Sequence, residues 1–265
     1  MPTQIDHIVI GVRNLAEASA NYANAGFTVT PGGEHVGGLT HNSLVSFGDG
    51  SYFELIAFTD PDNRPAEPHR WFDKIAVGDG LVDFAVLSSD LAAESAEFVE
   101  RGVSIEGPFD GGRTRPDGQQ VAWKTLRAGA DGAPLPFVID DQTPRELRVP
   151  NGAAAEHPVG FTGVAGLAIA VTELEPAKQA YAQLFGTLGE AVAPSVPGAK
   201  AGWKFELGDH TVELVEPDHE SGALRDHIEA RGEGPVEIVL RAPGAGDGRY
   251  LAFETTNGVR IRVIE

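Results

Sequence analysis

The chain contains no cysteine. Disulfide bonds, thiolate metal ligands and a cysteine nucleophile are therefore excluded. No apolar run approaches the roughly 18 residues that a membrane-spanning helix needs. A strand pattern begins almost at the N-terminus, where a signal peptide would carry a charged region and then a hydrophobic core. These absences predict a cytoplasmic protein.

Basic residues are scarce as well. The 20 Lys and Arg residues face 39 Asp and Glu residues, which gives a net charge of −19. Such a chain repels phosphate backbones and anionic lipid, so nucleic acid and membranes are not expected as partners. Glycine-rich nucleotide loops, a Gly-x-Ser-x-Gly elbow and a His-Glu-x-x-His pair are also missing. A small-molecule ligand is the expected partner, and the composition leaves a homodimer open.

What the chain does contain is an internal repeat. An apolar strand pattern around His7 is followed by a helical stretch and then by a strand that contains Glu54. The same order recurs with Gly166 in the first strand and Glu213 in the later one, at the same interval. Agreement without a gap over that length indicates a duplicated unit. The two copies differ chemically, because the first has a histidine where the second has a glycine.

Four passages follow this plan and predict an α+β fold. They cover residues 4–58, 81–142, 163–216 and 235–265. Helices are expected over 15–25, 91–101 and 176–185, whereas the fourth unit looks shortened and has no clear helix after its first strand. Two domains follow, over residues 1–149 and 161–265, joined by a linker at 150–160 that is rich in alanine and turn residues.

Several short motifs accompany the repeat. They are Asp6-His7-Ile8, Thr40-x-Asn42, Glu54-Leu55-Ile56 and Arg113-x-Arg115-Pro116-Asp117-Gly118 with a later Trp123. With these motifs the chain resembles the vicinal-oxygen-chelate superfamily, which includes glyoxalase I, extradiol dioxygenases and fosfomycin or bleomycin resistance proteins. Within it, the chain looks most like the glyoxalase-like domain group. The resemblance implies two tandem domains of paired βαβββ units, each with a curved mixed sheet that forms a half-open cup over a divalent metal ion.

The resemblance also implies metal ligands. It places them at His7 and Glu54, and the register adds Asp83 from the partner unit, for one zinc, nickel, manganese or iron ion. The fourth position falls on Phe137 or Val138, and neither side chain can coordinate a metal. The alternative is that His7 is hydrogen-bonded to a nearby carboxylate and that Asp83 is hydrogen-bonded inside a polar cup.

Arg113 and Arg115 are the expected substrate-binding cations. Two residues apart in an extended segment, they point to the same side and suit a carboxylate or phosphate. Alternatively, both could pair with Asp117 and only hold the loop. Trp71 and Trp123 are expected to wall an apolar pocket, although large aromatic residues are more often plain core.

Glu54 and His41 are the expected catalytic residues, the histidine because its ordinary pKa lies near neutrality. A solvent-facing strand histidine is the alternative. Together these residues predict a glyoxalase-like enzyme of small molecules, a divalent-metal-dependent isomerase or lyase. The alternative function is metal-free binding or sequestration of a small molecule, as in antibiotic-resistance proteins.

The second half is expected to be metal-free. Gly166 replaces the histidine, Glu237 stands at the position of Asp83, Arg262 takes the place of Glu54, and Glu213 remains. A buried ion pair among Glu213, Glu237 and Arg262 would satisfy these charges without a metal. Because extradiol dioxygenases keep their iron site in the second half, ring cleavage is not expected here.

Overall fold

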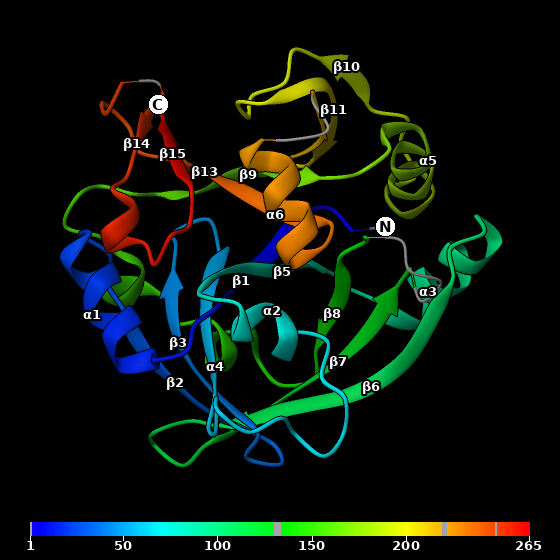
Figure 1. The fold of residues 1–265 in the computed structure, drawn as a ribbon. Coiled ribbons are helices and arrows are strands. Elements are labelled where there is room, and N and C mark those ends of the chain that lie inside the picture. Colours follow the sequence, from blue (N-terminus) through cyan, green and yellow to red (C-terminus); the bar gives the residue numbers. More distant parts are fainter. Residues whose placement is uncertain (1, 130–133, 219–221, 247) are drawn as a thin grey trace.

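The computed structural model describes residues 2–129, 134–218, 222–246 and 248–265. Its strands form two sheets that follow one another along the chain, as two tandem domains require (Figure 1). The strands of the first sheet lie before the predicted linker and those of the second after it. We keep 1–149, 150–160 and 161–265 as our proposal for the domain division. No helix among the described residues is long and apolar enough to cross a membrane.

The first sheet is a closed barrel of eight strands in the order β1-β4-β3-β2-β6-β7-β8-β5. The strands are β1 (Ile5–Gly11), β2 (Thr30–His35), β3 (Thr40–Ser46), β4 (Tyr52–Phe58), β5 (Gly80–Leu87), β6 (Ile105–Thr114), β7 (Gln120–Ala128) and β8 (Phe137–Asp141). In each unit the first strand pairs in parallel with the last, β1 with β4 and β5 with β8. The two units meet through the antiparallel pair β1 and β5.

The curved mixed sheet that the resemblance implied is confirmed, and in the first domain it curls until it forms a closed barrel. It closes along a short seam, where β2 pairs with β6 through Glu34–Thr114 and His35–Arg113. Gly33 makes this approach feasible, because it has a φ of 129° and a Cβ there would lie 2.0 Å from the carbonyl oxygen of Thr114. The seam places residues from both units around one enclosed interior.

The second sheet is open and has the order β10-β11-β12-β9-β13-β15-β14. Its strands are β9 (Gly163–Ala170), β10 (Glu190–Val192), β11 (Ala199–Leu207), β12 (His210–Pro217), β13 (Gly234–Arg241), β14 (Arg249–Tyr250) and β15 (Ile261–Ile264). The fourth unit is shortened as expected: β14 follows β13 in the order of elements, and the 3-10 helix η2 (Phe253–Thr255) lies between β14 and β15.

The three predicted helices are α1 (Leu15–Asn24), α3 (Leu91–Glu100) and α5 (Leu174–Phe185), which lie along the outside of the sheets (Figure 1). Asn14 and Asp90 cap α1 and α3 through their side chains. Besides η2, four short helical segments were not predicted: α2 (Phe72–Ala76), α4 (Arg145–Arg148), η1 (Gly152–Ala155) and α6 (Ala223–Arg231). Three of them have five residues or fewer, too short for a helical period to stand out.

One hydrophobic core continues from the first sheet into the second. It joins Phe53 and Phe98 to Tyr181 and Phe205, all fully buried. A hydrogen bond from the hydroxyl of Tyr22 to the carbonyl of Thr256, 3.1 Å long, adds a polar link. The two halves therefore pack against each other through a shared core.

Candidate functional site

The interior of the barrel contains a cavity of about 260 Å³. Its charged and imidazole groups are His7, His35, Glu54, Arg70, Arg113, Arg127 and Arg148. Its aromatic walls are Tyr52, Trp71, Phe109, Trp123 and Phe137. The lining comes from both units of the first domain, because barrel closure brings β6 and β7 opposite β1 and β4.

Glu54 on β4 is the centre of the polar cluster. One carboxylate oxygen accepts a hydrogen bond from the side-chain amide of Asn42 at 2.6 Å and lies 3.4 Å from Nε2 of His35. The other carboxylate oxygen lies 3.6 Å from Nε2 of His7. Burial by itself would raise the pKa of Glu54, but His35, His7 and Asn42 together lower it to about 2. Glu54 is therefore an ionised acceptor between two imidazoles.

His7 on β1 is oriented from behind. Its Nδ1 lies 2.6 Å from a carboxylate oxygen of the fully buried Asp6. The charge of Arg148 overcomes the effect of burial and holds the pKa of Asp6 well below its ordinary value. Because an ionised carboxylate only accepts hydrogen bonds, the proton lies on Nδ1 of His7, and Nε2 faces Glu54 and the cavity.

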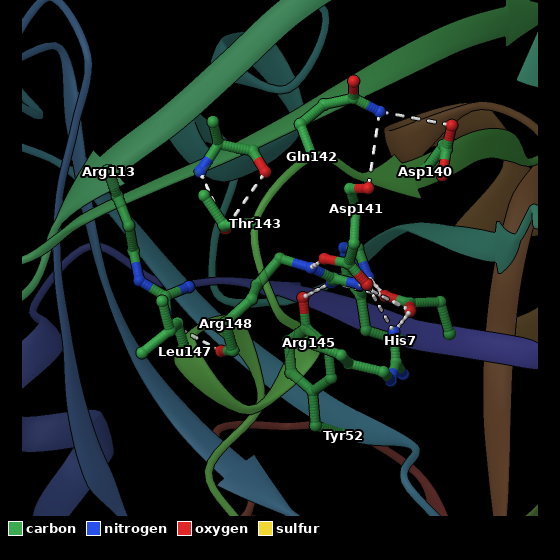
Figure 2. A network of polar contacts seen from close by, with 12 residues as sticks. His7, Tyr52, Arg113, Asp140, Asp141, Gln142, Thr143, Arg145, Leu147 and Arg148 are labelled. Atoms are coloured by element: carbon green, nitrogen blue, oxygen red, sulfur yellow. Dashed lines mark hydrogen bonds and ion pairs between the residues drawn. The ribbon is translucent and has the colours of Figure 1, made fainter.

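A buried ion network around Arg148 holds Asp6, and through it His7 (Figure 2). Arg148 of α4 is 1% exposed and donates hydrogen bonds to both oxygens of Asp6, at 2.8 and 2.9 Å. It also reaches Asp141 and the hydroxyl of Tyr52. Arg145, one turn earlier, donates to the same Asp6 at 2.6 Å. Ion pairs with Asp6 on β1 and Asp141 on β8 therefore hold the short helix α4 against the barrel.

Arg113 on β6 is a buried cation of a different kind. Its guanidinium is 2% exposed and donates one hydrogen bond, from Nη2 to the carbonyl of Arg148 at 2.7 Å. Its Nε finds no partner, and we find no carboxylate in ion-pair contact with it, within the part of the chain that the structure describes. Burial lowers the pKa of Arg113, while Tyr52 and Glu54 act in the opposite direction. The cavity therefore contains a positive group with donors to spare.

The other cations of the cavity already have partners. Arg148 is paired with Asp6 and Asp141. Arg70 lies 2.7 Å from a carboxylate oxygen of Asp83, and Arg127 lies 2.7 Å from Glu106. Arg113 is thus the cation left to meet an anionic ligand.

Trp123 and Trp71 form walls of the cavity. Trp123 on β7 packs edge-on against His35 and covers Gly111, where a Cβ would lie 2.2 Å from the indole nitrogen. Trp71, just before α2, donates its indole N–H to Asp83 at 2.9 Å. Gly111 therefore leaves room for the indole of Trp123, and the hydrogen bond to Asp83 holds the indole of Trp71. Both residues line the cavity.

Asp83 does not join His7 and Glu54. Its carboxylate is held by Arg70 and Trp71, and the guanidinium of Arg70 packs 4.8 Å from the centre of the Phe137 ring. A cation and an aromatic ring therefore occupy the side of the cavity where the resemblance implied two further metal ligands. Among residues 2–129, 134–218, 222–246 and 248–265, no group of three or more His, Asp or Glu side chains is arranged to hold a metal ion. The metal set implied by the resemblance does not fit these residues, and we derive no step through a metal.

Besides Asp83, two predicted site residues lie outside the cavity lining. Arg115 follows the end of β6 and pairs with Asp117 at 3.1 Å while donating to the carbonyl of Leu147 at 2.8 Å. His41 alternates with the buried Asn42 along β3 and so faces the other side of the sheet. Arg115 therefore makes the contacts expected if it only holds the loop. His41 lies away from Glu54.

His35 is the residue that sequence reasoning missed. It pairs with Arg113 across the seam, and its Nδ1 lies 2.8 Å from the hydroxyl of Thr40. The only sequence signal was its distance from the Thr40-x-Asn42 motif, since alternation on paired strands puts His35 and Asn42 on one face. Without the β2 register this signal could not be used.

In the corresponding region of the second domain, charged side chains form ion pairs with one another. The fully buried Glu237 accepts from Arg260 at 2.7 Å and from Arg262 at 2.9 Å. The expected ion pair is therefore present for Arg262, but Glu213 is not part of it. Glu213 accepts instead from the backbone and hydroxyl of Ser195, because β12 and β13 lie on opposite sides of β9.

Comparison with protein families identifies the first half of the chain and part of the second. A model described as a glyoxalase-like domain matches residues 5–185. This range contains the whole barrel and extends to the end of α5. No curated protein matches the chain.

Solved structures with the same fold are distant in sequence. A hypothetical protein from Staphylococcus aureus has a TM-score of 0.73 at 13% identity, over 98% of both chains. A mutant of 4-hydroxymandelate synthase from Streptomyces coelicolor has a TM-score of 0.60 at 17% identity, over 91% of this chain and 71% of the other. A fusion protein of a xylose isomerase-like TIM barrel and 4-hydroxyphenylpyruvate dioxygenase has a TM-score of 0.56 at 15% identity, over 92% of this chain and 37% of the other.

Proposed function

The chain belongs to the glyoxalase-like domain family, and from this premise we propose that its first domain binds a small organic anion inside the barrel and moves a proton on it. The fold is that of the vicinal-oxygen-chelate superfamily. The observation that carries the proposal is Arg113, a buried cation that lines the cavity and has no carboxylate in ion-pair contact within the described residues. A carboxylate would supply the missing acceptor and the missing negative charge.

The proton-transfer part rests on His7 and Glu54. Their reactive atoms lie 3.6 Å apart on the cavity wall, and Asp6 fixes the ring orientation of His7. An acid whose carboxylate is held by Arg113 would bring its neighbouring carbon into this enclosed, aromatic-walled space. One group of the pair can take a proton from that carbon and return it at the next atom, which is an isomerase step, or a leaving group can depart, which is a lyase step.

A second candidate is binding without turnover. Glu54 has a pKa of about 2 because of its imidazole and amide neighbours, and such a carboxylate is a weak base. If His7 does not take over as the base, the cavity sequesters its ligand. Both candidates need the same anion contact at Arg113, and they differ only in whether a proton moves.

Binding is tested first with purified protein and a panel of small acids, for example benzoate and pyruvate, beside the neutral analogue benzamide. Calorimetry should give tighter binding of the acids. Replacing Arg113 with Met should weaken this binding by about 1.5–3 kcal/mol, because one charge-assisted contact is lost. Arg115→Met is the matched control, since Arg115 is tied to Asp117 and Leu147 outside the cavity lining.

Equal binding of acids by wild type and Arg113→Met, with both variants folded by circular dichroism, would contradict the proposal. Proton transfer is then followed by NMR in D₂O as deuterium incorporation next to the carbonyl of the tightest-binding 2-oxo acid. His7→Gln should abolish it. Metal analysis of chelator-free protein provides a further check, because a stoichiometric divalent metal would overturn the metal-free form of the proposal.

A further inference from the structure

A second cavity lies between the two sheets and has about 240 Å³. It is bordered by α2 and β5 of the first domain and by β9 and β13 of the second. Most of its wall is apolar, from Val82, Phe84, Leu135, Ile169 and Pro235. Arg70 and Trp71 line both this interdomain cavity and the barrel cavity. The side-chain amine of Lys74 also borders the interdomain cavity.

Lys74 differs from the other four lysines of the chain. Each of those is in an ion pair with a carboxylate, as in Lys124–Asp110, Lys178–Glu175, Lys200–Glu216 and Lys204–Glu190. The Nζ of Lys74 has only two long contacts, to the carbonyl oxygens of Val82 at 3.4 Å and Glu233 at 3.5 Å. For Lys74 we find no carboxylate at ion-pair distance in the described parts of the chain. The charge of its ammonium form is therefore poorly compensated.

The charged groups around Lys74 do not make up for this. They are Arg70 and Asp73 near α2, Asp83 on β5, His227 and Arg231 on α6, and Glu233 before β13. Asp83 is already paired with Arg70, and the carboxylate of Glu233 accepts from the backbone of Thr172 at 2.6 Å. Burial lowers the pKa of Lys74, Asp83 opposes this, and Arg231 and Arg70 add to it.

We propose that Lys74 is a nucleophilic amine that forms a Schiff base with a small aldehyde or ketone in the interdomain cavity. A lysine that is removed from water and placed near other cations has more of its amine free to attack. The apolar wall suits a short hydrocarbon chain on the carbonyl compound. Lys74 is also partly buried, so less water reaches the imine to hydrolyse it.

The condensation balances without any further reactant. The nitrogen lone pair of Lys74 attacks the carbonyl carbon, a C–N bond forms, and the carbonyl oxygen becomes a hydroxyl by taking one amine proton. The hydroxyl then leaves as water with the second amine proton, and a C=N bond remains. No oxidation or reduction takes place.

The test uses the full chain, propionaldehyde as the probe and cyanoborohydride to trap the imine, followed by mass spectrometry of each lysine-containing peptide. Lys74 should be alkylated faster than Lys200 at neutral pH, by about tenfold for each unit by which its pKa is lower. Its labelling should also reach a plateau at a lower pH. Lys74→Arg, which keeps the charge but cannot form an imine, should remove the fast label.

Lys200 supplies the internal control, because it is ion-paired and half exposed on the surface. Labelling of Lys74 at or below the rate of Lys200 would overturn the proposal. Labelling of Lys74 only after unfolding in urea would also overturn the proposal, because the amine would then have only a structural role between the carbonyls of Val82 and Glu233. Loss of fast labelling in Lys74→Arg, with unchanged labelling of the other four lysines, supports it and shows that the variant is folded.

Discussion

The two acids that flank Arg148 decide how His7 is presented to the cavity. Asp6 bridges Arg148 and the Nδ1 of His7, and Asp141 holds the other side of the guanidinium. Asp6 and Arg148 are both almost fully buried. Breaking such a pair by removing one partner leaves an uncompensated charge away from water, which is costly even where the intact pair adds little. At the scale of single residues, the site therefore depends on Arg148, for which the sequence predicted no functional role.

Replacement of Arg148 by Met tests this dependence. The free energy of unfolding should fall by about 3–5 kcal/mol, because Asp6 is then buried without its main partner. Urea denaturation measures the change. The double variant Asp6→Asn with Arg148→Met should recover part of it, since no unpaired carboxylate remains. An Arg148→Met variant as stable as wild type, with the half-buried turn variant Arg115→Met as reference, would show that the network adds nothing.

Among the elements, the seam between β2 and β6 matters most for the site. Only two residue pairs join these strands, and one of them, His35–Arg113, brings the missed imidazole beside the unpaired guanidinium. A short seam is a weak point of a closed sheet, because few backbone hydrogen bonds hold it. The close approach depends on Gly33, which has no Cβ to meet Thr114.

Gly33→Ala should therefore open the seam. Hydrogen exchange followed by mass spectrometry should show faster exchange in the peptides that contain β2 and the end of β6, and acid binding should weaken with it. Gly37→Ala is the matched control, because Gly37 also has a positive φ, 90°, but a Cβ there meets nothing within 4 Å. Backbone strain is thus common to both variants, and the clash is not. The same exchange pattern in both would mean that the seam does not depend on this contact.

At the scale of the whole molecule, His157 connects the two halves. It lies just after η1, and its Nδ1 accepts a hydrogen bond from the backbone N–H of Thr28 at 2.9 Å. Its Nε2 donates to the carbonyl of Ser46 at 3.0 Å, and its ring packs against Phe27 and Phe161. Burial lowers the pKa of His157. A neutral ring is required, because a proton on Nδ1 would displace the bond from Thr28.

This gives a pH dependence of stability. The pKa of His157 in the folded protein lies below its ordinary value of 6.5, so the unfolded chain takes up more protons as the pH falls below about 6.5. The free energy of unfolding should therefore decrease on acidification, by at most about 1.4 kcal/mol per pH unit for one such group. Denaturation between pH 7.5 and 5 measures the slope.

His157→Gln should have the smaller slope, because it keeps hydrogen-bonding groups but does not titrate. His69 and His227, whose pKa values burial lowers to about 4, titrate in both proteins and cancel in the comparison. Identical slopes for wild type and variant would contradict the prediction.

The sequence by itself determined the α+β class, the four units and the tandem arrangement. Strand alternation, helix caps such as Asn14 and Asp90, and the repeated interval to Glu54 and Glu213 are local or periodic signals, which survive without tertiary information. The resemblance to the family placed His7 and Glu54 on neighbouring strands, and the first and last strands of this unit are parallel neighbours.

Only the tertiary structure decided which other side chains share the cavity. Closure of the barrel brought in His35 and Arg113, left Arg115 on a turn with Asp117, and gave Asp83 to Arg70 and Trp71. These outcomes depend on the register of strands far apart in the chain, and a shift of one residue turns a side chain from one face of a sheet to the other. They also depend on competition among many acids for few cations, which is settled only when all of the partners are in place.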